Sequence, residues 1–170
     1  AGAAVTLVAG PTALATPEGV ERVDVVSAAQ MADAVLARAD ASDVFVSVAA
    51  VADYRPVEVH EQKVKKKDAP MTIALEPTVD ILATVAARPK APFCVGFAAE
   101  SQDVARLGEE KRRRKKLAML VANRAQDAMG ADDNEVTILD ATGAHALPRM
   151  DKLALARRLV AEIASRMKAR

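Results

Sequence analysis

The chain contains 170 residues, of which 51% are hydrophobic, and its formal net charge is +1. These values predict a single domain over residues 1–170 with a substantial core, because typical domains have this size. Only 2% of the residues are aromatic and the overall charge is not basic, which argues against a nucleic-acid-binding protein. The single cysteine, Cys94, excludes an internal disulfide and favours a reducing, cytoplasmic location. No apolar run approaches the roughly 18 residues that a membrane span requires, so no membrane partner is expected.

The amino-terminal part of the chain predicts two short strands, one helix and a longer strand. The strands are the apolar runs Val5 to Ala9, Val23 to Val26 and Val44 to Ala52. We expect the first and the last to be buried, the last on both faces of a parallel sheet, since its only polar residue is a serine. Ser27 and Gln30 form a capping box, which predicts a helix over Ala28 to Ala39.

The remainder of the chain alternates predicted strands and helices. Strands are predicted over Met71 to Leu75 with one buried face, over Phe93 to Ala99 and over Leu117 to Ala122. Helices are predicted over Asp80 to Ala87, Gln102 to Lys116 and Lys152 to Lys168. A hairpin is expected around Thr142 and Gly143. This alternation predicts an α/β fold with a mostly parallel sheet.

Three of the predicted strands are followed directly by a polar side chain: Asp53, Glu100 and Asn123. In an open α/β sheet, ligands bind just beyond the carboxyl ends of the strands, so these three residues would lie along one functional edge. Asp53 alone reads equally as the start of a turn with Arg55 and Pro56, but the threefold repetition favours a functional role. For Glu100 and Asn123 the choice between a site residue and an ordinary loop residue stays open.

Two groups of lysines are candidates for binding an anion. Lys63 to Lys67 follow the strand that carries Asp53, so they are predicted to form a loop over the sheet edge. Lys111 and Lys115 are like charges one helical turn apart without acidic partners at i,i+4, which is unfavourable unless an anion lies between them. A simply solvated basic helix is the alternative. Lysines beside one carboxylate suit a nucleoside triphosphate with magnesium, with Asp53 as the candidate metal ligand.

Several motifs occur in an order that resembles bacterial phosphopantothenoylcysteine synthetase, the phosphopantothenate-cysteine ligase that uses CTP. The motifs are SVAAVADYRP at Ser47 to Pro56, KVKKK at Lys63 to Lys67, TVDIL at Thr78 to Leu82, VGFAAES at Val95 to Ser101, LVAN at Leu120 to Asn123 and ADDNEVTIL at Ala131 to Leu139. The basic run KRRRKK precedes LVAN. One departure is Val79 in the TVD turn, where the family usually has proline.

The resemblance implies a Rossmann-like, three-layer homodimer with a short flap or hairpin extension, acting in coenzyme A biosynthesis. It implies that CTP and Mg2+ activate 4'-phosphopantothenate as an acyl-cytidylate, which cysteine then opens. The residues that match the family's nucleotide site are Ser47, Val48, Ala49, Asp53, Lys63, Val79, Asp80, Ile81, Leu82, Phe97, Lys111 and Lys115. Of these, Lys63 is implied to be catalytic.

The resemblance also implies that further parts of the family's site lie before the position matching Ala1. These are an opening strand, a glycine-rich phosphate loop and an asparagine, so we expect residues 1–170 alone to be an incomplete catalyst. In many bacteria the domain is fused to a decarboxylase that uses FMN. The alternatives are a non-catalytic nucleotide-binding module and an NAD(P)-dependent oxidoreductase, although the chain has no GxGxxG motif.

Overall fold

A computed structural model describes residues 2–60, 62–66, 68, 70–128 and 130–168, without the side chains of residues 127 and 128. Lys67, the last residue of the predicted lysine loop, lies outside this set. The strands are β1 (Val5–Ala9), β2 (Val20–Asp24), β3 (Val44–Ser47), β4 (Tyr54–Pro56), β5 (Leu75–Pro77), β6 (Phe93–Glu100), β7 (Met119–Arg124), β8 (Asp133–Asp140) and β9 (Gly143–Asp151). The helices are α1 (Ala28–Leu36), η1 (Ala39–Ala41), α2 (Ile81–Ala86), α3 (Val104–Arg114), α4 (Ala125–Ala128) and α5 (Lys152–Lys168).

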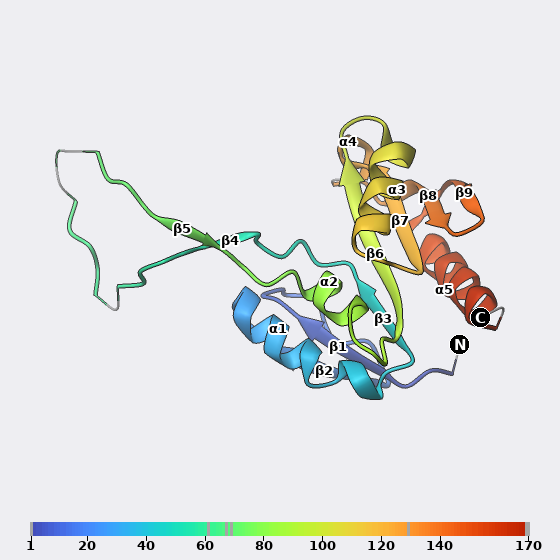
Figure 1. The fold of residues 1–170 in the computed structure, drawn as a ribbon, viewed down its shortest axis with the longest axis horizontal. Coiled ribbons are helices and arrows are strands. Elements are labelled where there is room, and N and C mark those ends of the chain that lie inside the picture. Colours follow the sequence, from blue (N-terminus) through green and yellow to red (C-terminus); the bar gives the residue numbers. More distant parts are fainter. Residues whose placement is uncertain (1, 61, 67, 69, 129, 169–170) are drawn as a thin grey trace.

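A five-stranded sheet in the order β3-β6-β7-β8-β9 forms the centre of the body. Its β3–β6 and β6–β7 pairs are parallel, whereas β8 and β9 form the expected antiparallel hairpin at the far edge. Strands β1 and β2 pair in parallel with each other, and β4 and β5 form an antiparallel arm that projects from the body (Figure 1). The predicted α/β class is thereby confirmed.

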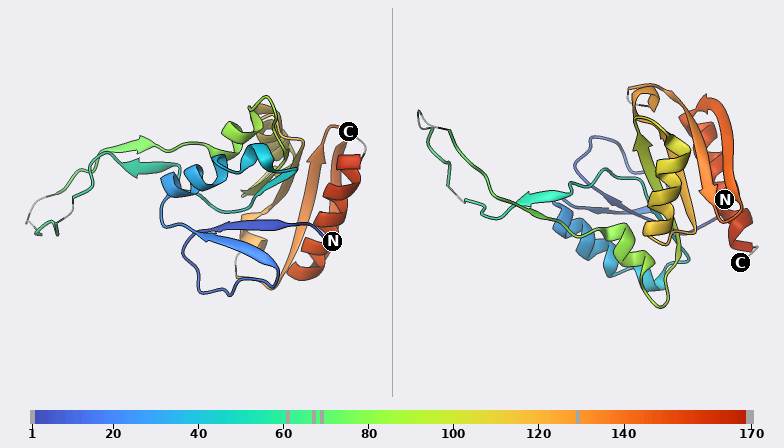
Figure 2. Two further views of the ribbon diagram at one scale, coloured as in Figure 1. Left: turned by 90° about the horizontal axis from the view of Figure 1, so that it is seen from below. Right: turned by 45° about the horizontal axis from the view of Figure 1, so that its top comes forward.

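Helices cover both faces of the central sheet, which gives the expected three layers. On one face, residues of α1 and α2 pack with alternate residues of β6 and β7, including Cys94, Ala98 and Leu120. On the other face, α5 packs Leu155, Leu159 and Ile163 against the remaining strand residues. Figure 2 shows α5 alone along its side of the sheet. The period-2 alternation of the strands therefore supplies two separate cores.

Helix α3 lies close to the first face because it carries a glycine there. A Cβ atom on Gly108 would stand 2.5 Å from Cδ1 of Leu139 and 3.2 Å from Cβ of Ala122. Gly96 in β6 is similarly crowded, since its Cβ would meet Leu82 at 2.8 Å. Small residues at these points let α2 and α3 approach the strands that carry the candidate site.

Local sequence signals locate the helices well. The capping box of α1 is present, with the side chain of Ser27 accepting from the backbone N–H of Gln30. Helix α5 has the predicted bounds, and α2 begins after Asp80, which is its N-cap residue. In the described part of the chain, no helix combines the length and apolar character needed to cross a membrane.

The prediction of one buried strand over Val44 to Ala52 is wrong, because β3 ends at Ser47. Beyond that residue the chain leaves the sheet and turns, with the N–H of Val51 bonded to the carbonyl of Ala49 at 3.1 Å. Val48 is 62% exposed. Only the first four residues of the apolar run Val44 to Ala52 pair with β6, so the run is longer than the strand. The expected burial of the run on both faces of the sheet does not occur. Strand β1 also differs from its prediction, since its first three residues are exposed.

The arm residues are more exposed than their alternating pattern predicts. Met71, Ile73 and Leu75 are 70%, 58% and 56% exposed, so the expected buried face is absent. The reason is that β5 pairs only with β4, over three residues. No described layer covers the two-stranded arm, which reaches away from the sheet in both views of Figure 2.

Candidate functional site

The base of the arm brings two sequence-distant segments of the predicted site together. The Oγ1 of Thr78 donates to the carbonyl of Ala52 at 2.6 Å, and its N–H donates to the carbonyl of Asp53 at 2.9 Å. Asp53 is thus held beside the turn that leads to Asp80, although it follows the end of β3 by six positions rather than directly. Its side chain is exposed. Asp53 begins the arm instead of ending the strand.

Asp80 links this turn to helix α3. One carboxylate oxygen accepts from the N–H of Ala83 at 3.0 Å and caps α2, while the other lies 2.8 Å from Nζ of Lys115. Partial burial raises the pKa of Asp80, but Lys115 and the Ala83 N–H outweigh it and hold this pKa below its ordinary value. The carboxylate is therefore kept charged, with both of its oxygens engaged.

Lys111 meets a carboxylate at the end of the neighbouring strand. Its Nζ lies 2.9 Å from Oε1 of Glu100, the last residue of β6. The unfavourable pairing of Lys111 with Lys115 that the sequence suggests is therefore relieved, because each lysine has an acidic partner outside its own helix. The expectation that only an anion could relieve this repulsion is wrong.

The other polar strand ends also occupy one edge of the sheet. Ala99 in β6 is in register with Asn123 in β7, and Glu100 with Arg124. The parallel pairing confirms that Glu100 and Asn123 lie at the same edge of the sheet. Both are still part of their strands, however, since Glu100 is the last residue of β6 and Asn123 the second-last of β7. Ser47, the last residue of β3, pairs with Gly96, one position before Phe97. The predicted residues of β3 and β6 are therefore direct neighbours.

Several predicted nucleotide-site residues cannot offer a free side chain. Ile81 and Leu82 are buried in the first core, at 7% and 8% exposure, so their side chains are not available to a ligand. Phe97 is partly buried and packs against the second core. Val48, Ala49 and Val79 are exposed in the loops beside β3 and α2.

Lys63 lies on the arm, apart from the other predicted residues. It is exposed, and no described residue forms a hydrogen bond or ion pair with it. Figure 1 shows that the arm formed by β4 and β5 reaches away from α3, the helix that includes Lys111. That Lys63 binds the nucleotide stays a prediction. It requires either that the arm moves towards α3 or that the arm of a second chain supplies the lysine.

The described residues contain no group of three or more His, Cys, Asp or Glu side chains that could hold a metal ion. Magnesium commonly uses one or two protein carboxylates and takes its other ligands from water and substrate phosphates. The single carboxylate of Asp53 therefore fits a metal that arrives with a triphosphate, and does not fit one held by the protein alone.

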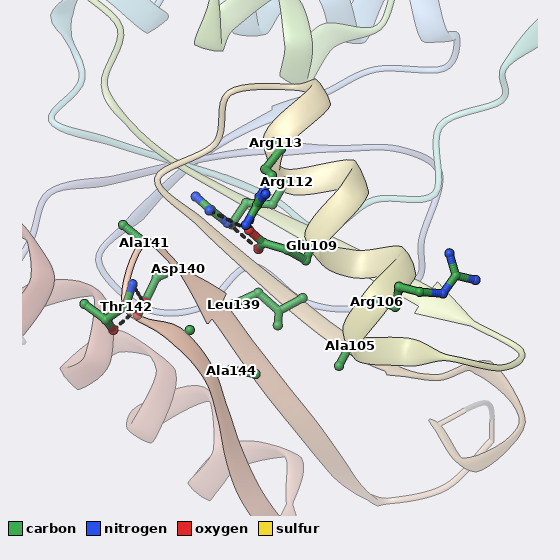
Figure 3. A pocket seen from close by; sticks show the side chains of 11 residues that line it. Ala105, Arg106, Glu109, Arg112, Arg113, Leu139, Asp140, Ala141, Thr142 and Ala144 are labelled. Atoms are coloured by element: carbon green, nitrogen blue, oxygen red, sulfur yellow. Dashed lines mark hydrogen bonds and ion pairs between the residues drawn. The ribbon is translucent and has the colours of Figure 1, made fainter.

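A separate cavity of about 420 Å³ lies on another face of α3, and none of the predicted site residues lines it (Figure 3). Arg112 and Arg113 both point to Glu109 there, at 2.7 and 2.6 Å. The hydrogen bond from Arg112, followed by that from Arg113, outweighs burial and lowers the pKa of Glu109 to about 2. Two guanidinium groups share this one carboxylate, so the cluster keeps a net positive charge, and the side chain of Arg113 stays 76% exposed.

Sequence reasoning missed a buried ionic cluster at the β8–β9 turn. Asp140 is 8% exposed and accepts from Nε of Arg166 at 2.7 Å and from Thr142. Burial raises the pKa of Asp140, yet the hydrogen bonds from Thr142 and Arg166 dominate and hold it well below its ordinary value. Only the i,i+4 spacing of Glu162 and Arg166 was visible in the sequence. The cluster joins α5 to the hairpin and is structural.

The fold and the paired charges at the end of β6 define a three-layer α/β domain with a polar site at one strand edge. The sequence model of the DNA/pantothenate metabolism flavoprotein C-terminal domain family matches residues 1–167, and the chain belongs to this family. The resemblance noted in the sequence is thereby confirmed.

Two curated relatives bear the name coenzyme A biosynthesis bifunctional protein CoaBC. The chain is 44% identical over 172 residues to that of Vibrio vulnificus, covering 98% of this chain and 43% of the relative. It is 44% identical over 169 residues to that of Bacillus subtilis, covering 96% and 42%. The chain therefore spans less than half the length of these relatives.

A solved structure of the C-terminal domain of CoaBC superimposes with a TM-score of 0.83 at 37% identity, covering 99% of this chain and 77% of that chain. A Cab2 mutant in complex with phosphopantothenate-cysteine gives a TM-score of 0.74 at 15% identity, covering 89% and 54%. The second likeness shows the shared fold alone.

Proposed function

We propose that this chain is the synthetase part of a coenzyme A biosynthesis protein, and that it joins 4'-phosphopantothenate to cysteine with CTP. The observation that carries the proposal is the set of contacts running from Asp53 through Thr78 and Asp80 to Lys115. It connects Asp53, Asp80 and Lys115, three of the positions that match the family's nucleotide site. The names of the relatives support a role in coenzyme A biosynthesis. Membership of the same family supports assigning that role to this chain.

The proposed reaction has two steps. The carboxylate of phosphopantothenate attacks the α-phosphate of CTP, so that pyrophosphate leaves and an acyl-cytidylate forms. The amine of cysteine then attacks the acyl carbon, and CMP leaves with its phosphate oxygen. No covalent protein intermediate is needed, and Cys94 is buried in the core and unsuited to be a nucleophile. Catalysis would therefore depend on positioning and charge stabilisation.

Lys111 and Lys115 would neutralise phosphate oxygens of CTP, and Asp53 would approach the nucleotide or its Mg2+. Lysine ammonium groups bind phosphate as point charges, and each has three donors, so one can hold a carboxylate and a phosphate together. Lys63 would act on the activated phosphate once the arm reaches the site. Backbone groups at Ala49 and at the start of α2 remain for the base and ribose.

A homodimer is part of the proposal because of the arm. An isolated two-stranded hairpin is marginally stable, and exposed apolar residues commonly mark an interface. The exposed apolar residues of the arm are Tyr54, Val57, Val59, Val64, Met71, Ile73 and Leu75. Light scattering should give twice the chain mass for the wild type and a lower mass for the double variant Met71→Glu, Ile73→Glu.

The decisive assay uses the protein as encoded, in the reducing conditions expected of the cytoplasm. Pyrophosphate should appear only when CTP, magnesium and phosphopantothenate are all present, and CMP should follow when cysteine is added. Binding of CTP without any pyrophosphate release would favour a non-catalytic module. Oxidation of NAD(P)H by the same preparation would show that the ligase assignment is wrong.

A further inference from the structure

Glu100 differs from an ordinary loop residue in its burial and in its ion pair. It is the last residue of β6, its side chain is only 16% exposed, and its Oε1 lies 2.9 Å from Nζ of Lys111. Lys111 is 33% exposed, so the ammonium is in contact with the protein and still partly open. A partly buried carboxylate at the end of a central strand therefore holds a lysine that is implied to bind phosphate.

The other roles available to Glu100 fit the structure less well. It belongs to no described cluster of three metal-binding side chains. Its carboxylate would repel a phosphate in direct contact, whereas in the ion pair its charge is balanced by Lys111. The pair differs from the surface pair of Arg106 with Glu110, which is about 60% exposed on both sides. It also differs from the more buried pairs within α3, because it joins that helix to the end of a strand.

We propose that Glu100 is a positioning residue for nucleotide binding, acting through Lys111. This inference rests on the proposed function. The lysine side chain has four rotatable bonds, and fixing it only when the ligand arrives costs rotamer entropy. The bond to Glu100 fixes one donor of the ammonium beforehand and leaves two for phosphate oxygens. The strand end thus sets the direction in which α3 presents its charge.

The geometry of α3 supports this division of labour. Lys111 is directed to the end of β6, while Lys115 is directed to Asp80 at the start of α2. Two like charges one turn apart are therefore drawn to different anchors. A triphosphate is an extended chain of three phosphate groups. Two ammonium groups that are held at separate points can therefore contact two different phosphate groups at the same time. Glu100 lies in the VGFAAES motif, but it is not among the residues that match the family's nucleotide site.

The test is direct titration of the encoded protein with CTP and magnesium, together with steady-state kinetics. Glu100→Gln should weaken CTP binding about tenfold, as loss of a pre-ordered lysine predicts. The KM for CTP should rise, whereas the KM for cysteine should stay within about twofold. Glu100→Asp, which keeps the charge, should recover part of the affinity. In a Lys111→Met background, Glu100→Gln should have no further effect, because both substitutions remove the same interaction.

Glu110→Gln is the matched control, since it removes a carboxylate of α3, the helix of Lys111, that pairs with Arg106 at 2.8 Å on an exposed face. It should leave the CTP affinity unchanged, and the melting temperatures of the wild type and both glutamine variants should agree within a few degrees. Equal or tighter CTP binding by Glu100→Gln would overturn the positioning role. Additive losses in the double variant would overturn it as well. Failure of the wild type itself to bind CTP would instead overturn the proposed function, and the inference with it.

Discussion

Nζ of Lys115 lies 2.8 Å from Oδ2 of Asp80, while Oδ1 of the same carboxylate caps α2 through Ala83. Asp80 thus performs two separable tasks, one for helix α2 and one for α3. Asparagine is as good an N-cap residue as aspartate but carries no charge.

Asp80→Asn is therefore expected to keep the stability within about 0.5 kcal/mol, whereas Asp80→Ala should lose about 1 kcal/mol of unfolding free energy with the cap. Both should weaken CTP binding to a similar extent, because both release Lys115. Urea denaturation and CTP titration measure the two effects separately. If Asp80→Asn binds CTP as the wild type does, the ion pair has no role in presenting Lys115.

Lys63 offers a test of the arm. Lys63→Ala is expected to abolish synthesis without lowering the melting temperature, since the side chain is exposed and has no described partner. One charge-assisted hydrogen bond to phosphate is worth about 1.5–3 kcal/mol, or roughly a tenfold to a hundredfold loss if only binding suffers. A greater loss in kcat would indicate a role in the chemical step. Lys66→Ala, an exposed lysine of the same segment, is the control and should keep most of the activity.

Gly108 tests the packing that brings α3 to the sheet. In a helix, alanine is normally preferred to glycine by about 1 kcal/mol, but here its Cβ would lie 2.5 Å from the buried Leu139. Gly108→Ala should therefore destabilise the fold by about 1–3 kcal/mol, as overpacking does. Gly10→Ala is the comparison, because its Cβ would have no neighbour closer than 4.0 Å. Higher stability of Gly108→Ala in chemical denaturation would mean that α3 can shift outward without cost.

The cluster at the β8–β9 turn should give the fold a dependence on acid. Because the pKa of Asp140 is lowered in the folded protein, its contribution is fully present above the ordinary value of 3.8 and is lost progressively as the pH falls from there through the lower pKa of the folded state. Asp140→Asn removes the charge-assisted bond to Arg166, which keeps its pair with Glu162, and should cost about 1.5–3 kcal/mol at pH 7. The difference between wild type and variant should shrink on acidification, which denaturant melts at pH 7 and pH 3 would reveal. A difference independent of pH would assign the effect to packing.

Much of the fold was predictable because its signals are local. The Ser27–Gln30 capping box and the regular apolar spacing of α5 depend on residues within one or two turns, and both appear as expected. The ordered motifs identified the family, and the two parallel strand ends placed Glu100 and Asn123 on one edge. A resemblance of this kind names the positions of a site, but it does not say what each side chain contacts.

The remaining features depend on contacts between segments far apart in the chain. Neither the carboxylate partners of Lys111 and Lys115 nor the bond between Asp140 and Arg166 leaves a periodic trace in the sequence. The end of β3 and the exposure of the arm depend on how long a neighbouring strand or layer continues. The residue types and their spacing can be read from one segment of the chain. Ion pairing and burial also depend on a second segment that packs against the first. For this reason the sequence could place two lysines on one helix, and the folded chain alone shows that each is already held by a carboxylate.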